Sequence, residues 1–387
     1  MLLAACGKGA ATLSSEPLAP VAAQGAVSVV TRNTSRIGGQ RPAADAAAVA
    51  RAVYPGLTAG SRPQAVVLVD EHDWSAALAA SVLAGAPVGA PILFSEGATL
   101  PDVTRQAIEA LHPRGLPALG GAQLIRIDDA ARVPGMLATR TIPAQAPAAC
   151  ARALEQLLAS IEGAPPTQAI VVPEGAPRAL TMPAAGLAAE SGAPILYVEH
   201  ARVPAATSTT LASMHRPSMY VIDPSLVSAR VLSALRRLGR VTTVASTPAA
   251  GPRAAAVANA IAIARFTDGS FGWGVKEPGH GLVFANLARP LDGPAAALLS
   301  ASGNYGPLLL LAGARSIPAP LAVYLGDIQP AYTSAPAYRP VRGVYNHGWL
   351  IGDESAIAGS TQAEIDSLLE ISPSRQSSEE AQSEQNG

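Results

Sequence analysis

The stretch Gly89-Ala90-Pro91-Ile92-Leu93-Phe94 decides the fold, because closely similar stretches recur twice further along the chain. The second copy is Gly192-Ala193-Pro194-Ile195-Leu196-Tyr197, and a weaker third copy is Gly306-Pro307-Leu308-Leu309-Leu310. Self-similarity at a fixed period indicates a repeat architecture. The sequence therefore predicts three copies of one structural unit.

Other features recur at nearly constant distances from Pro91, Pro194 and Pro307. An apolar run lies 25, 24 and 25 residues before them, and an arginine lies 55, 54 and 54 residues before them. A later apolar run follows the first two prolines by 28 residues and the third by 44, which predicts an insertion between Asp327 and Arg342. The three arginines are Arg36, Arg140 and Arg253.

This pattern divides the chain into five segments. Residues 1–26 form an N-terminal segment and flexible linker, and residues 27–130, 131–245 and 246–371 are the three repeats. Residues 372–387 are rich in Ser, Glu and Gln, so we expect a disordered tail. Each repeat of about 100 residues is large enough to bury its own core.

Strands and helices alternate within each repeat. The run Ala65–Val69 has no polar alternation, which is typical of a strand buried on both faces. Alternation at this pitch predicts parallel βαβ units with right-handed crossovers, so each repeat is expected to be an α/β module. Arg36–Arg41 is expected to be a glycine-bearing turn before the first helix. The other expected strands are Val27–Val30, Pro91–Phe94, Leu116–Gly121, Ala169–Val172, Pro194–Tyr197, Met219–Ile222, Leu282–Ala285, Pro307–Leu311 and Leu350–Ile351.

Composition limits the partners. Of the 387 residues 49% are hydrophobic and 14% charged, and the net charge is −1, so no overall basic field exists to attract nucleic acid. The basic residues are almost all arginine, since Lys8 and Lys276 are the only lysines. Arginine suits bidentate contact with phosphate or carboxylate, although a codon preference would produce the same bias.

No motif for catalysis or for a cofactor is found. Cys6 and Cys150 supply neither a disulfide framework nor a metal ligand set, and the glycines of 272–281 do not fit a dinucleotide fingerprint. Asp70-Glu71-His72-Asp73 follows a predicted strand at the usual ligand-side edge of a sheet, but the other repeats have no counterpart to it. We therefore expect a solvated loop there, and predict no metal, no cofactor and no enzymatic activity.

The segment Leu3-Ala4-Ala5-Cys6 resembles the lipobox of bacterial lipoproteins, in which the cysteine is lipidated. Only five residues precede Cys6, so the charged and apolar regions of a secretory signal are missing. Either the true start lies upstream or the match is accidental. We favour the first, which predicts an extracytoplasmic protein with a lipid anchor at Cys6 as its one attachment to the membrane.

The repeat resembles that of the cell wall binding repeat 2 family of Gram-positive bacteria. Arg36-Ile37-Gly38-Gly39-Gln40-Arg41 is similar to the opening of that repeat, and Ala77–Ala80, Gly89–Leu93 and Leu119–Gly121 match later parts in order. Gly352–Ile357 looks like the closing element of the last repeat. The resemblance covers about residues 27–371.

The resemblance implies three Rossmann-like or toprim-like modules around a pseudo-threefold axis. They would bind an anionic wall polymer, such as a teichoic-acid-like polysaccharide, at the cell wall or cell surface. The sequence departs from the family where Ala76 and Arg178 replace an aspartate and where Gln145 replaces a second arginine. Three equivalent arginines could converge on one polyanion, or each could bridge neighbouring modules. The predicted polymer-binding residues are Arg36, Arg41, Arg140 and Arg253.

Two other functions stay open. An extracytoplasmic solute-binding lipoprotein would hold a small ligand between two large lobes, a layout that conflicts with three equal repeats. A hydrolase or transferase acting on wall polysaccharide would need a pair of catalytic residues at a fixed distance. The sequence favours a non-catalytic wall-binding protein over both.

Overall fold

The structure is a computed structural model, and it describes residues 29–127, 129–133, 135–143, 146–301, 306–331 and 344–372. The linker with Cys6 and the tail after residue 372 lie outside the described residues. Most of the insertion predicted between Asp327 and Arg342 also lies outside them.

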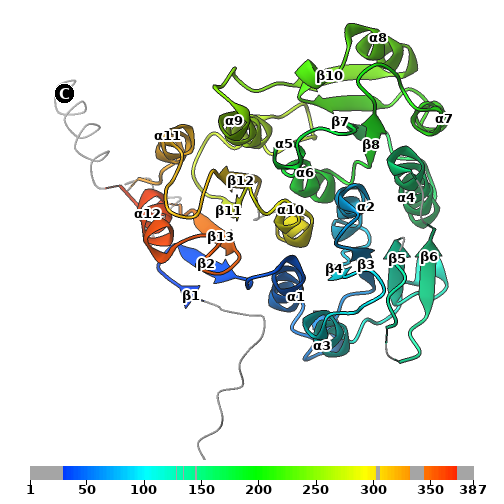
Figure 1. The fold of residues 1–387 in the computed structure, drawn as a ribbon, viewed down its shortest axis with the longest axis horizontal. Helices are drawn as coiled ribbons and strands as arrows, with labels where there is room; N and C mark the ends of the chain where they lie inside the picture. The colour runs from blue at the N-terminus through cyan, green and yellow to red at the C-terminus, as the bar shows by residue number, and fades with distance from the viewer. Residues whose placement is uncertain are drawn as a thin grey trace, which may run out of the picture.

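Three sheets, each built around parallel strands and covered by helices, form the molecule. Figure 1 shows them around a common centre, where the helices α2 (Trp74–Ala80), α6 (Ala184–Ser191) and α10 (Asp292–Ala296) lie. The predicted α/β architecture of three modules in a pseudo-threefold arrangement is confirmed.

The first module has a four-stranded sheet in the order β4-β3-β5-β6, with every neighbouring pair parallel. Its central strand β3 is fully buried from Val66 to Val69, as expected for a run without polar alternation. The elements of this module are α1 (Pro42–Val53), η1 (Ala59–Ser61), β3 (Val66–Asp70), α2, η2 (Ser81–Ala84), β4 (Ile92–Ser95), α3 (Asp102–Leu111), η3 (Pro117–Leu119), β5 (Leu124–Ile127) and β6 (Thr139–Ile142).

The second module repeats this arrangement in a sheet of order β10-β9-β7-β8. Two helices, α5 and α6, lie between β7 and β8, and Met182 and Pro183 separate them. The elements are α4 (Pro147–Glu162), β7 (Gln168–Pro173), α5 (Arg178–Thr181), α6, β8 (Ile195–Val198), α7 (Ala205–Ser213), β9 (Ser218–Ile222), η4 (Pro224–Leu226), α8 (Ala229–Leu238) and β10 (Arg240–Val244).

The third module has five strands in the order β1-β2-β13-β11-β12. Its first two strands come from the beginning of the chain and the other three from the end. The elements are β1 (Val29–Val30), β2 (Thr34–Ile37), α9 (Pro252–Arg265), β11 (Gly281–Asn286), α10, η5 (Ala297–Ser300), β12 (Leu308–Leu311), α11 (Ala319–Asp327), β13 (His347–Ile351) and α12 (Gly359–Leu369).

The N-terminal strand β2 closes the ring. It pairs in parallel with β13, so that Arg36 lies opposite Leu350 and Ile37 opposite Ile351. β6 and β10 hold the same fourth place in the first and second sheets. Each fourth strand leads to a helix that begins at a proline and packs on the edge strand of the next module: α1 on β4, α4 on β8 and α9 on β12.

The first and third sheets therefore do not coincide with the predicted sequence repeats. β2 falls within the predicted repeat 27–130 but completes the third sheet, whereas β6 falls within 131–245 and completes the first. The predicted repeat boundaries follow the period of the sequence. That period does not reveal that β2 pairs with β13.

Two local predictions were wrong. Leu116–Gly121 is not a strand: η3 begins at Pro117, which has no N–H to donate to a central ladder, and the strand β5 starts later at Leu124. Arg36 does not lie in a turn, because it is the third residue of the strand β2. The edge strands β6 and β10 were not predicted, since their sequences are rich in Thr and Arg rather than apolar.

Small residues bring the modules together at the centre. Gly85 follows η2, and a Cβ at this position would lie 1.9 Å from the backbone oxygen of Ala189 in α6. Gly186 in α6 approaches Ser300 in η5 in the same way, with its Cβ position 2.6 Å from the Ser300 Oγ. Such contacts leave no room for a larger side chain at the pseudo-threefold axis.

Candidate functional site

Arg36 is buried inside the third module. Its side chain is 1% exposed, and it donates from Nε to Gln362 Oε1 (3.1 Å) and from Nη1 to the carbonyl of Gly352 (3.2 Å). Burial lowers the pKa of Arg36, and the charges of Glu354 and Asp353 oppose that shift. A guanidinium enclosed in this way cannot reach a polymer, so Arg36 joins β2 to α12 instead.

The other three predicted arginines are exposed. Arg41 forms an ion pair with Glu96 (3.2 Å), and both side chains face solvent. Arg140 lies in β6. Arg253 lies in the first turn of α9 and donates to the carbonyl of Ala312 (3.4 Å). Each is accessible, and binding of a polymer by any of them stays a prediction.

The structure does not place Arg36, Arg140 and Arg253 at equivalent positions. Aligned on the ends of the fourth strands, Arg36 corresponds to Thr141 and Thr243. Arg140 is one residue away from that place, and Arg253 follows β10 in a helix. Figure 1 shows β2, β6 and α9 in three separate parts of the ring, so the three arginines do not meet on one ligand.

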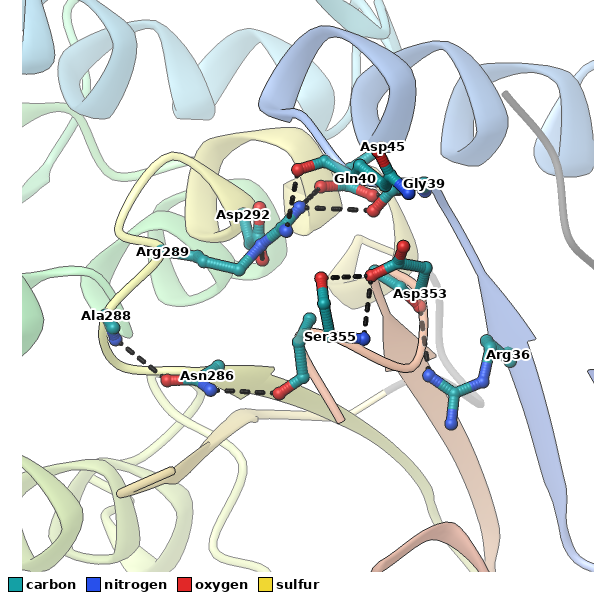
Figure 2. A network of polar contacts seen from close by, with 12 residues as sticks. Arg36, Gly39, Gln40, Asp45, Asn286, Ala288, Arg289, Asp292, Asp353 and Ser355 are labelled. Atoms are coloured by element: carbon teal, nitrogen blue, oxygen red, sulfur yellow. Dashed lines mark hydrogen bonds and ion pairs between the residues drawn. The ribbon is translucent and has the colours of Figure 1, made fainter. Parts of the chain in front are cut away.

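A buried ion network joins the third module to the first (Figure 2). Arg289, in the loop after β11, donates from Nε to Asp292 Oδ2 (2.9 Å) and forms a second ion pair with Asp45 of α1. It also donates to the carbonyl of Gln40 (3.0 Å), while Asp45 accepts from the backbone N–H of Gly39 (2.6 Å). The guanidinium of Arg289 thus forms ion pairs with two carboxylates, one from each module.

The two carboxylates of this network are fully buried. Burial raises the pKa of Asp45 to about 6, although Arg289 lowers it in part. Burial and then the charge of Asp45 raise the pKa of Asp292 well above its usual range. Desolvation is therefore the main cause of both shifts, and the second buried negative group adds to it at Asp292. This network holds the ring together and offers no open surface to a ligand.

A cleft of about 360 Å³ lies between the first and second modules, at the carboxyl ends of β3 and β7. Open parallel sheets commonly bind ligands at this edge. The hydroxyl of Tyr197, a lining residue of the cleft, donates to the carbonyl of Ser75 (2.7 Å) and so joins β8 to the first turn of α2. The lining residues are His72, Asp73, Trp74, Ser75, Pro147, Val172, Pro173, Glu174, Gly175, Ala176, Arg178, Thr181 and Tyr197.

The polar groups in and beside the cleft form hydrogen bonds with one another. His72 Nδ1 lies 2.8 Å from Asp70 Oδ1, and this contact raises the pKa of His72. Burial alone would raise the pKa of Asp70, but hydrogen bonds from His72 lower it overall. The hydroxyl of Ser75 donates to Asp73 (2.8 Å), which also caps α2 by accepting from the N–H of Ala76 (2.9 Å).

The cleft exposes hydrogen-bonding groups of His72, Asp73 and Ser75. A nucleophilic serine needs a hydrogen-bonded base, and Ser75 is held by Asp73 rather than by His72. Among the described residues no cluster of His, Cys, Asp and Glu is arranged to hold a metal ion. The segment expected to be a solvated loop, Asp70–Asp73, supplies His72 and Asp73 to one wall of the cleft. Local sequence does not reveal the cleft, because its second wall comes from residues 172–181 of another repeat.

Solved structures with a similar fold are known, although the sequence alone has no match. No protein-family model matches the sequence, and no curated protein matches it. The structure is similar to that of Cwp6 from Clostridium difficile, with a TM-score of 0.66 and 17% identity over 89% of this chain and 50% of that chain. It is also similar to Cwp8 from the same organism, with a TM-score of 0.64 and 17% identity over 88% and 52% of the two chains.

The chain therefore spans about half the length of these two structures. At 17% identity the likeness shows a common fold, and it gives no residue a role. The resemblance of the repeat to the cell wall binding repeat 2 family stays a prediction from the sequence. No helix of the described residues is long and apolar enough to cross a membrane.

Proposed function

We propose that this protein is a non-catalytic, extracytoplasmic protein that binds an anionic polymer of the bacterial cell wall. The observation that carries the proposal is the ring of three α/β modules, a fold it has in common with Cwp6 and Cwp8, which are cell wall proteins of C. difficile. The sequence resemblance to cell wall binding repeats supports the same function independently. Lipid attachment at Cys6 remains part of the proposal as a second anchor.

The test is co-sedimentation of the full chain with purified Gram-positive walls, before and after extraction of their anionic polymers, over a series of salt concentrations. We expect binding that disappears with the polymers and weakens as salt rises, because charge contacts to a polyanion release counterions. Equal binding to extracted and untreated walls would refute recognition of the polymer. Turnover of wall material by the pure protein would refute the non-catalytic role.

The cleft favours a second candidate, the binding of a small solute. Its volume of about 360 Å³ falls within the range of small-molecule sites, and it combines an indole with several polar groups. Titration with soluble wall sugars, followed by the fluorescence of Trp74, tests this function, with Trp74→Phe as the control for the source of the signal. A saturable change that Trp74→Phe abolishes would support the cleft as a solute site.

A further inference from the structure

Two turns of the second module lie side by side at the amino edge of its sheet. One is His215–Ser218, which leads into β9, and the other is the last turn of α8 together with Gly239 and Arg240, where α8 joins β10. The backbone N–H of Arg240 donates to the carbonyl of Pro217 (3.0 Å), and Arg240 pairs with Ser218 in the parallel ladder. Four arginines of these turns form what we call the arginine cluster: Arg216, Arg236, Arg237 and Arg240.

The backbone fixes this arrangement. A Cβ at Gly239 would lie 2.3 Å from the carbonyl oxygen of Pro217, so the two turns approach more closely than any other residue would allow. Arg240 adds a contact from its Nε to Ser218 Oγ (3.3 Å). The backbone therefore holds the four arginines on two adjacent segments, and their side chains are exposed to solvent.

The cluster carries unbalanced positive charge. Arg240 forms an ion pair with Asp268, and no other described carboxylate pairs with the four arginines. Glu162 and Glu190 also lie at this edge, but on the β7 and β8 side of the sheet, where they line a depression with Thr167. Three guanidinium groups thus face solvent without a carboxylate, on a chain whose net charge is −1.

Such a surface fits an extended polyanion. A guanidinium binds two phosphate oxygens at once, and several guanidinium groups from two adjacent turns can bind successive anionic groups of one chain. Like charges held together repel one another, and a bound polyanion removes that repulsion. The cleft between the modules is less suited to a polyanion, because Asp73 and Glu174 oppose the charges of His72 and Arg178.

We propose that the arginine cluster is the site at which this protein binds a phosphate-bearing wall polymer. The inference rests on the proposed function and deepens it. It assigns the contact to one edge of the second module, in place of a convergence of Arg36, Arg140 and Arg253. Figure 1 shows α8 and β10 at the periphery of the ring, and the four arginines are exposed there.

The experiment compares two double variants of the full chain that remove equal charge. R236Q/R237Q alters the cluster, and R51Q/R230Q removes two exposed arginines elsewhere, one from α1 and one from the start of α8. Binding is measured to inorganic polyphosphate and to untreated and polymer-extracted walls over a salt series. Thermal melts establish that both variants are folded, as expected for exposed positions.

We expect R236Q/R237Q to bind polyphosphate and untreated walls at least about tenfold more weakly, and R51Q/R230Q to stay within about twofold of the parent. The slope of log K against log salt should become shallower by roughly 1 to 2 in the cluster variant, since about 0.7 to 0.9 counterions are released per charge contact.

Three outcomes would overturn the inference. Equal losses in the two double variants would mean that bulk charge, rather than this site, governs binding. Unchanged binding by R236Q/R237Q would exclude the cluster and leave the proposed function in place. Failure of the parent chain to bind polyphosphate and untreated walls would overturn the inference and the proposed function together.

Discussion

Replacing Arg289 by methionine tests the ion network that joins the third module to the first. The guanidinium is 17% exposed and serves two carboxylates that are not exposed at all. Removing one partner of a buried ion pair leaves an uncompensated charge, which typically costs about 3 to 5 kcal/mol. We therefore expect Arg289→Met to lower the free energy of unfolding by an amount in this range at pH 7.5.

The pH dependence of that loss follows from the raised pKa of Asp45. In the folded protein this pKa is about 6, against an ordinary value of 3.8, so the folded state holds the proton more tightly than the unfolded state. The stability contributed by protonated Asp45 is complete below pH 3.8 and is lost as pH rises through 6. At about 1.4 kcal/mol per pKa unit, the shift corresponds to at most about 3 kcal/mol.

Arg289→Met should raise the pH at which the stability contributed by the protonated carboxylates is lost. Without Arg289 no cation lowers the pKa of Asp45 or Asp292, so both carboxylates keep their protons longer. The difference in stability between parent and Arg289→Met should therefore be small near pH 5 and grow towards pH 8. Urea unfolding followed by circular dichroism, repeated at pH 5, 6.5 and 8, measures this difference.

Two further variants sharpen the test. Arg105→Met removes two surface ion pairs on α3, with Asp102 and Glu109, and should cost no more than about 1 kcal/mol at any pH. Adding Asp45→Asn to Arg289→Met removes one buried charge and should recover part of the lost stability at pH 8. A loss below about 1 kcal/mol for Arg289→Met, or a loss that does not change with pH, would refute the reasoning.

The remaining predictions concern packing and the buried arginine. Gly85→Ala places a methyl group against the backbone of Ala189 and should destabilise the protein by about 1 to 3 kcal/mol, whereas Gly60→Ala, which meets open space, should stay within about 0.5 kcal/mol. Equal melting temperatures for these two variants would contradict close packing at the axis. Arg36→Met should cost about 1 to 3 kcal/mol, because Gln362 loses a buried partner, yet leave wall binding by the folded protein unchanged. Weaker wall binding at unchanged stability would show that Arg36 contacts the polymer.

The sequence predicted the parts of the fold that local patterns specify. The buried strand at Val66–Val69 was placed to within a residue, because a run without polar alternation must be covered on both faces. The edge strand Arg240–Val244 was missed, since a strand with one open side need not be apolar. The fold class follows from the alternation of such runs, which is why it could be predicted without any long-range information.

The candidate site depends on contacts that no local pattern carries. Arg36 keeps step with Arg140 and Arg253 in sequence, but its partners Gly352 and Gln362 are more than 300 residues away, and they decide that it is buried. The arginine cluster could have been noticed as Arg236-Arg237-Leu238-Gly239-Arg240. Its enlargement by Arg216 requires the pairing of β9 with β10.

The contacts at the ring closure compensate for a missing covalent link. β5 and β6 follow one another along the chain, as do β9 and β10, whose connection contains η4 and α8, but β13 and β2 come from opposite ends of the chain. Ordering β2 on its sheet therefore costs entropy that a short loop would not demand. Polar contacts gather at this junction: the backbone N–H of Asn33 donates to Asp366 (2.7 Å), and Arg32 pairs with Glu370 (2.8 Å).

The same argument explains where a polymer site is best placed. At the closure, β2 is the fourth strand that has no short covalent connection to its parallel neighbour β13. Figure 1 shows α8 and β10 on the opposite side of the ring from β2 and α12. The arginine cluster also draws both of its turns from one continuous segment, residues 215–240, within a single sheet. Opening at the closure would therefore leave the proposed polymer contact intact, whereas a site formed by arginines from three modules would lose part of its ligand set.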